Sequence, residues 1–94
     1  MATMNSISIN YTDTELRNLV EEFITQQKTD FTLKGVCSYI LYWAVEDGKN
    51  SKKDSLIESD ELQQGDQDKV KHILETIILD GRITVTANDY YSKR

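Results

Sequence analysis

Apolar residues recur with helical spacing in the first third of the chain. They occupy positions i, i+3, i+4, i+7 and i+8 of one face: Leu16, Leu19, Val20, Phe23 and Ile24. The residues just before them match a capping box, in which the Thr12 hydroxyl accepts from the Glu15 amide and the Glu15 carboxylate accepts from the Thr12 amide. The pattern therefore predicts a helix from Asp13 to Gln27.

A second helix is predicted after the β-prone stretch Phe31-Thr32-Leu33. Thr32 or Asp30 is placed to cap it, and it ends before Gly48. One face carries Leu33, Cys37, Ile40 and Ala44, flanked by Val36 and Leu41, and an adjacent arc carries Tyr39, Tyr42 and Trp43. A surface helix needs an apolar face over only about a third of its circumference. This helix is therefore central to the domain or covered by a second partner.

The last third of the chain predicts a third helix and a β-hairpin. The helix repeats the spacing of the first, in Val70, Ile73, Leu74, Ile77 and Ile78. Asp66 is placed to cap it, and Gly81 suits the left-handed position that follows a helix. The period then changes to two, because Ile83 and Val85 alternate with polar residues. A turn-rich segment and the β-prone Tyr90-Tyr91 complete the predicted hairpin.

Two further segments complete a single α+β domain over residues 1–94. Residues 1–11 form an arm or a short strand on the core, because Ile7, Ile9 and Tyr11 alternate with polar residues. Residues 48–66 form a long polar connection. Structureless loops of that length are uncommon in compact domains, so we expect a short helical turn from Leu56 to Gln64. The chain has no proline and no internal repeat that would mark a second domain.

The order helix, short strand, helix, helix and hairpin, together with the run KVKHILETIILDGRITVTANDYY at 69–91, resembles the winged-helix superfamily. Residues 73–83, ILETIILDGRI, are similar to a run in the winged helices of the TFIIE-related subunit of RNA polymerase III. The resemblance implies a small winged-helix-like domain. One feature departs from it: the connection 48–66 separates the second and third helices, whereas a DNA-reading helix-turn-helix uses a turn of three or four residues.

Composition limits the classes of protein to which the chain can belong. Its 94 residues carry 16 acidic and 11 basic side chains, and the sequence pI is about 4.7. The longest apolar run, Tyr39 to Val45, is far short of the roughly 20 residues that cross a bilayer, and the N-terminus lacks the features of a secretory signal. A lone Cys37 excludes an internal disulfide and suits a reducing compartment. We therefore expect a cytoplasmic or nuclear protein with no membrane partner.

Nucleic-acid binding is one candidate function, because the resemblance suggests it. If the third helix entered a groove, its outward residues would be Gln67, Asp68, Lys71, His72 and Glu75, of which two are acidic and none is arginine. The cations that could contact nucleic-acid phosphates are Lys69, Lys71 and, in the wing, Arg82. Lys49, Lys52 and Lys53 would join them if the fold brings these residues together. Affinity for DNA rests largely on neutralised phosphates. A DNA-binding regulator that uses the third helix and wing is thus the alternative interpretation.

Protein binding is the leading interpretation. The arc of Tyr39, Tyr42 and Trp43 is either core covered by the arm or the wing, or a contact patch of the kind enriched at interface hot spots. The excess apolar surface of the second helix and the acidic third helix favour a non-enzymatic module that contacts proteins, with a homodimer as one form. A third alternative is an inhibitor that fills a host protein's nucleic-acid groove, although interleaved acids and bases mimic DNA poorly.

Catalysis has little support in the sequence. His72 is the single histidine, and Cys37 lies on the predicted core face, where a thiol usually acts as a small hydrophobe. A Cys37–His72 pair would require spatial adjacency that sequence alone does not show. The chain has no phosphate-binding loop and no metal-ligand spacing. We therefore expect no enzyme activity, no metal or cofactor and no small-molecule substrate.

Overall fold

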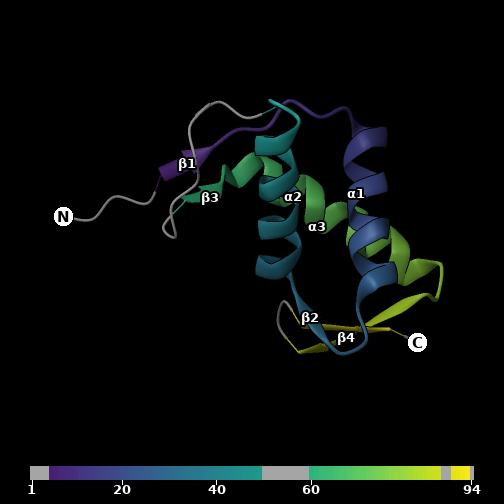
Figure 1. Ribbon diagram of the computed structural model, residues 1–94. Coiled ribbons are helices and arrows are strands. Elements are labelled where there is room, and N and C mark those ends of the chain that lie inside the picture. The colour runs from purple at the N-terminus through teal and green to yellow at the C-terminus, as the bar shows by residue number, and fades with distance from the viewer. Residues whose placement is uncertain (1–4, 50–59, 88–89, 94) are drawn as a thin grey trace.

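The computed structural model describes residues 5–49, 60–87 and 90–93. These residues form three helices, α1 (Asp13–Gln26), α2 (Leu33–Glu46) and α3 (Gln64–Leu79), and five strands, β1 (Asn5–Ile7), β2 (Phe31–Thr32), β3 (Asp60–Leu62), β4 (Ile83–Ala87) and β5 (Tyr90–Lys93). In Figure 1, α1 and α2 lie side by side, α3 crosses behind them, and the C-terminal strands lie across their lower end. The predicted α+β class is confirmed.

The helix ends follow the local chemistry of the sequence. The predicted capping box of α1 is present, with the Glu15 amide 3.2 Å from Thr12 Oγ1 and the Thr12 amide 3.0 Å from Glu15 Oε1. Thr32, not Asp30, caps α2, because its hydroxyl accepts from the Gly35 amide at 3.0 Å.

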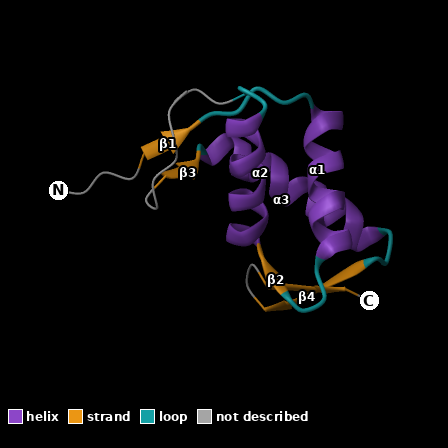
Figure 2. Ribbon diagram, viewed as in Figure 1, coloured by secondary structure: helices purple, strands orange, loops and turns teal. Residues whose placement is uncertain are grey.

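The predicted C-terminal hairpin is present in a three-stranded antiparallel sheet of order β2-β5-β4 (Figure 2). Phe31 of β2 pairs with Tyr91 of β5, and Ile83 of β4 pairs with Lys93. The register of β4 against β5 shifts between Val85 and Ala87. The short strand that precedes α2 thus joins the hairpin and closes one end of the helical core.

The core is built from the apolar faces that the helical spacing predicts. Side chains of all three helices, the arm and the C-terminal sheet are buried together: Ile7, Leu16, Val20, Ile24, Phe31, Val36, Cys37, Ile40, Leu41, Leu62, Val70, Ile73, Leu74, Ile77, Ile83 and Tyr91. Leu19, Phe23, Leu33 and Ile78 pack against this core while partly exposed. The α2 helix contributes the most buried residues of the three helices, as expected from its wide apolar face.

The start of α3 and the segment before it differ from the prediction. Residues 60–62 form β3, which pairs in parallel with β1 of the arm, instead of ending a helical turn from Leu56 to Gln64. Residues 56–59 of that predicted turn lie outside the described residues. The α3 helix begins at Gln64, so Asp66 is inside the first turn and does not cap it. Instead, Asp66 Oδ2 accepts from the Ile9 amide at 3.2 Å and holds the arm.

The arm is only partly a strand. Regular pairing covers Asn5–Ile7, whereas Ile9 and Tyr11 of the predicted alternation lie beyond it and pack on the core half-buried. The Asn10 amide donates to the Lys49 carbonyl at 2.7 Å and ties the arm to the end of α2. Among the described residues, no helix is both long enough and apolar enough to cross a bilayer.

Candidate interaction surface

Two aromatic side chains of α2, Tyr42 and Trp43, are exposed, and Tyr39 lies half-buried beside them; we call the three the aromatic surface. Tyr42 is 55% exposed and Trp43 is 36% exposed. The ring of Trp43 meets Tyr42 edge-to-face at 5.6 Å between centroids and Tyr39 at 6.3 Å. The described residues of the arm and the hairpin therefore leave Tyr42 and part of Trp43 uncovered, and the three rings form one cluster.

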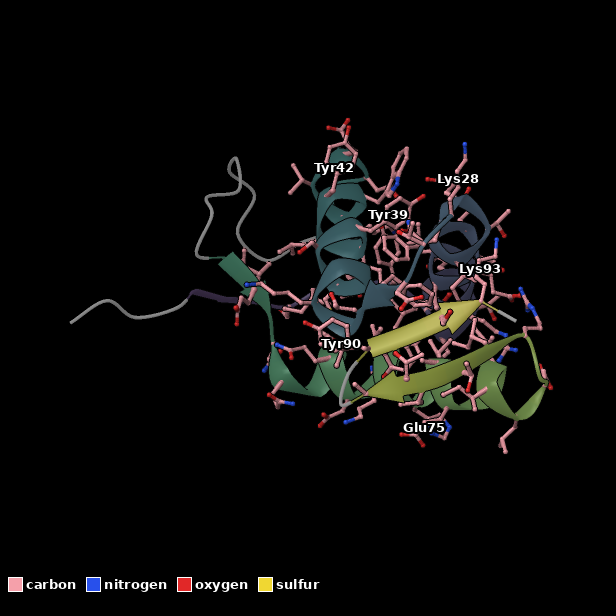
Figure 3. All side chains as sticks on the ribbon, turned by 90° about the horizontal axis from the view of Figure 1, so that it is seen from below. Lys28, Tyr39, Tyr42, Glu75, Tyr90 and Lys93 are labelled. Carbon is pink, nitrogen blue, oxygen red and sulfur yellow. The ribbon has the colours of Figure 1, made fainter. Side chains whose placement is uncertain are left out.

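A chain of ring contacts supports the aromatic surface from below. Tyr39 meets Phe23 of α1 at 5.3 Å, Phe23 meets Phe31 of β2 at 5.6 Å, and Phe31 stacks on Tyr91 of β5 at 5.6 Å. Figure 3 shows Tyr39 in the space between α2 and α1, and Tyr42 above it on α2 in this view. Tyr39 thus connects the exposed rings to the core.

Polar groups that border the aromatic surface are mostly acidic. Tyr39 Oη accepts from Gln26 Nε2 at 3.4 Å and donates to Glu22 Oε2 at 3.5 Å, both on α1. Glu46 is exposed one turn after Tyr42 on the same helix. The sequence reasoning missed Glu22 and Gln26, although their i, i+4 spacing on the polar side of α1 places both on one face.

The end of α2 adds a further carboxylate. Asp47, one turn after Trp43, accepts from Tyr11 Oη at 2.7 Å. Burial, followed by the hydrogen bond and the charge of Asp47, raises the pKa of the Tyr11 phenol well above its ordinary value. Tyr11 therefore remains a neutral hydrogen-bond donor to Asp47 beside the last turn of α2.

The described basic residues proposed for nucleic-acid binding lie on different elements, α3, the start of the hairpin and the segment after α2. Lys69 and Lys71 are exposed on α3. The guanidinium of Arg82 instead bonds to the Glu21 carboxylate of α1, which holds the pKa of Glu21 below its ordinary value. Lys49 lies at the end of α2, where its charge helps the Thr12 amide and hydroxyl to lower the pKa of Glu15. Lys52 and Lys53 lie outside the described residues.

The outward face of α3 is mixed in charge. Asp68, His72 and Glu75 are exposed on it, as predicted. Gln67 does not point outward freely, because its side-chain amide donates to the Leu62 carbonyl at 2.7 Å. An open pocket of about 400 Å³ lies between this face and the start of α1, lined by Asp13, Asp68, Lys69, His72 and Ile73.

Cys37 and His72 occupy different environments. Cys37 is buried in the core, and burial raises the pKa of its thiol to about 12. His72 is exposed on α3. A thiol with so high a pKa is a poor nucleophile at neutral pH. Among the described residues, no group of three or more histidine, cysteine or acidic side chains is placed to hold a metal ion.

No family model, curated protein or solved structure matches the chain. Function is therefore inferred from the chemistry of its own surface, of which the aromatic surface is the most distinctive part.

Proposed function

We propose that the protein is a non-enzymatic interaction module that contacts other proteins through the aromatic surface. The observation that carries this proposal is the exposure of two adjacent large aromatic residues, Tyr42 at 55% and Trp43 at 36%. Tyrosine and tryptophan are enriched among residues that dominate binding energy at protein interfaces. Each offers a large apolar area with few rotatable bonds, so little conformational entropy is lost on binding.

The packing of α2 supports the same proposal. Ile40 and Ala44 of the same helix are fully buried, and α2 packs against both α1 and α3. The helix is thereby fixed, and Tyr39 is further held by its contacts with Phe23 and Gln26. A surface that is already ordered before binding keeps more of its interaction energy as affinity.

Site-specific photo-crosslinking in the cells that make the protein tests the proposal. A photoreactive phenylalanine analogue at Tyr42 is expected to give discrete protein adducts, which the additional change Trp43→Ser removes. The same analogue at Glu75, exposed on α3 on the far side of the molecule (Figure 3), serves as the control. Identical adducts from both positions, or none from position 42, would overturn the proposal. Light scattering over a concentration series then distinguishes a homodimer from a different partner.

A DNA-binding regulator is the second candidate. Two observations favour it. The hairpin follows α3 in a sheet of order β2-β5-β4, as the winged-helix resemblance implies, and Lys69 and Lys71 are exposed on α3. Asp68 and Glu75 on the same face oppose it, because they repel phosphates. Salt-sensitive retardation of duplex DNA that weakens in Lys69→Ala and Lys71→Ala is the expected signature. Absence of retardation at low salt and micromolar protein removes this candidate.

A further inference from the structure

The charges around the aromatic surface define what it would bind. Glu22 contacts the Tyr39 hydroxyl, Glu46 follows Tyr42 by one turn, and Asp47 follows Trp43 by one turn. Three carboxylates thus border the exposed rings. Lys49 follows α2 by three residues, and its charge acts on Glu15.

Other cations lie farther along the molecule. Lys34 is in the first turn of α2, eight residues before Tyr42, which corresponds to about 12 Å along a helix. Lys28 follows the end of α1 and lies beyond Tyr39 as seen from Tyr42 (Figure 3). The exposed rings Tyr42 and Trp43 are therefore at the acidic end of this face.

We propose that the aromatic surface binds a cationic amphipathic helix, an inference that rests on the proposed function. The apolar side of such a helix would cover Tyr42 and Trp43, and its lysine or arginine side chains would reach the surrounding carboxylates. The same cations can stack on the exposed ring faces, where a cation–π contact adds to the attraction. The acidic border then favours this ligand over a neutral or acidic one.

A second copy of the chain fits this surface less well. In a two-fold symmetric dimer the same patch faces itself. When the two-fold axis passes through Tyr42 and Trp43, the acidic border of one copy meets the acidic border of the other, and like charges across an interface disfavour association. The carboxylates that border the aromatic surface therefore disfavour self-association centred on it.

Two synthetic helices provide the probes. Each is tryptophan-free and as long as α2, 14 residues, with leucines on one face and either lysines or glutamates on the other. Trp43 is the single tryptophan of the protein, so its emission reports the binding directly. The Leu/Lys helix is expected to shift this emission to shorter wavelength with saturation, whereas the Leu/Glu helix is expected to cause no shift.

Variants distinguish binding of the Leu/Lys helix at the aromatic surface from a general attraction of this cationic helix to an acidic protein. The double change Glu22→Lys and Glu46→Lys is expected to weaken the Leu/Lys helix by about tenfold or more, and Tyr42→Ser by about tenfold. Glu75→Lys makes the same kind of charge reversal on α3 and is expected to alter affinity by less than about twofold, because salt screens distant charges. Circular dichroism confirms that each variant is folded. If the double lysine variant unfolds, the double variant Glu22→Gln and Glu46→Gln, which removes the two charges without reversing them, is measured in its place.

The remaining outcomes overturn the inference in distinguishable ways. Equal weakening by Glu75→Lys shows general charge attraction and no local site. Failure of the Leu/Lys helix to bind, combined with a dimer that Tyr42→Ser dissociates, identifies a second copy as the occupant and leaves the proposed function intact. Failure to bind, combined with no adducts from position 42 in cells, removes the inference and the proposed function together.

Discussion

The guanidinium of Arg82, at the start of the hairpin, donates a hydrogen bond to the carboxylate of Glu21, which lies 61 residues earlier on α1. Arg17 also contacts Glu21, at 3.3 Å, and reaches Thr76 of α3 at 3.1 Å. These contacts connect α1 to the junction of α3 and β4. They also hold Arg82 against the side of α1.

Replacing Glu21 with Gln is expected to destabilise the protein by about 0.5–1 kcal/mol at neutral pH, because the contacts are partly exposed. The pKa of Glu21 is lowered in the folded state, chiefly by Arg82. Its stabilising effect is therefore present above the ordinary pKa of 4.5 and is lost as pH falls through the lower folded value. Urea unfolding across this pH range measures the difference, which should disappear in acid. A difference that grows on acidification would contradict this assignment.

Substitutions on opposite sides of α2 are expected to differ sharply in their effect on stability. Ile40→Ala removes a fully buried side chain and should cost about 2–5 kcal/mol. Tyr42→Ser changes an exposed residue and should alter the free energy of unfolding by less than about 0.5 kcal/mol. Chemical denaturation of both variants checks this. A large loss in Tyr42→Ser would mean that Tyr42 supports the fold and is not simply available to a partner.

Two glycine substitutions are expected to act in opposite directions. Gly81 follows α3 with φ +78°, so Gly81→Ala is strained although no atom blocks the new methyl group. We expect a loss of about 1 kcal/mol or more. Gly65 lies in the first turn of α3 with open space around it, and Gly65→Ala should stabilise by about 0.4–1 kcal/mol. The melting temperature should therefore rise in Gly65→Ala and fall in Gly81→Ala. A higher melting temperature in Gly81→Ala would contradict the left-handed backbone conformation of Gly81.

The Cys37 thiol is expected to be unreactive in the folded protein. Burial raises its pKa to about 12, so hardly any thiolate exists at pH 8. A chromogenic disulfide reagent at that pH should react slowly with the native chain and rapidly once urea unfolds it. Equal rates in the two conditions would show that the thiol is accessible in the native state.

Local patterns in the sequence account for most of the helices. The spacing of Leu16, Val20 and Ile24 defined the buried side of α1, and the Thr12 hydroxyl defined its start. Gly81 marked the end of α3 in the same way, because glycine lacks a Cβ atom and adopts the positive φ of this position without strain. Such features depend on a few neighbouring residues, so sequence alone is enough to predict them.

The start of α3 and the exposure of the aromatic surface depend on distant residues and could not be predicted. β3 exists because Asp60–Leu62 pairs with the arm, a partner more than half the chain away with no turn to reveal it. The same pairing draws Asp66 toward Ile9 and away from a capping role. Likewise, helical spacing placed Trp43 beside Tyr39, but its exposure depends on the path of the arm and hairpin.

Both sheets of the described structure join opposite halves of the chain: β1 pairs with β3, and β2 pairs with β5. A fragment that ends after α2 would therefore have two strands without their partners and would lack α3, which supplies Val70, Leu74 and Ile77 to the core. A fragment that begins at β3 would have the hairpin but not the strand that anchors it. We expect neither fragment to fold alone, and mixing the two should restore a folded heterodimer.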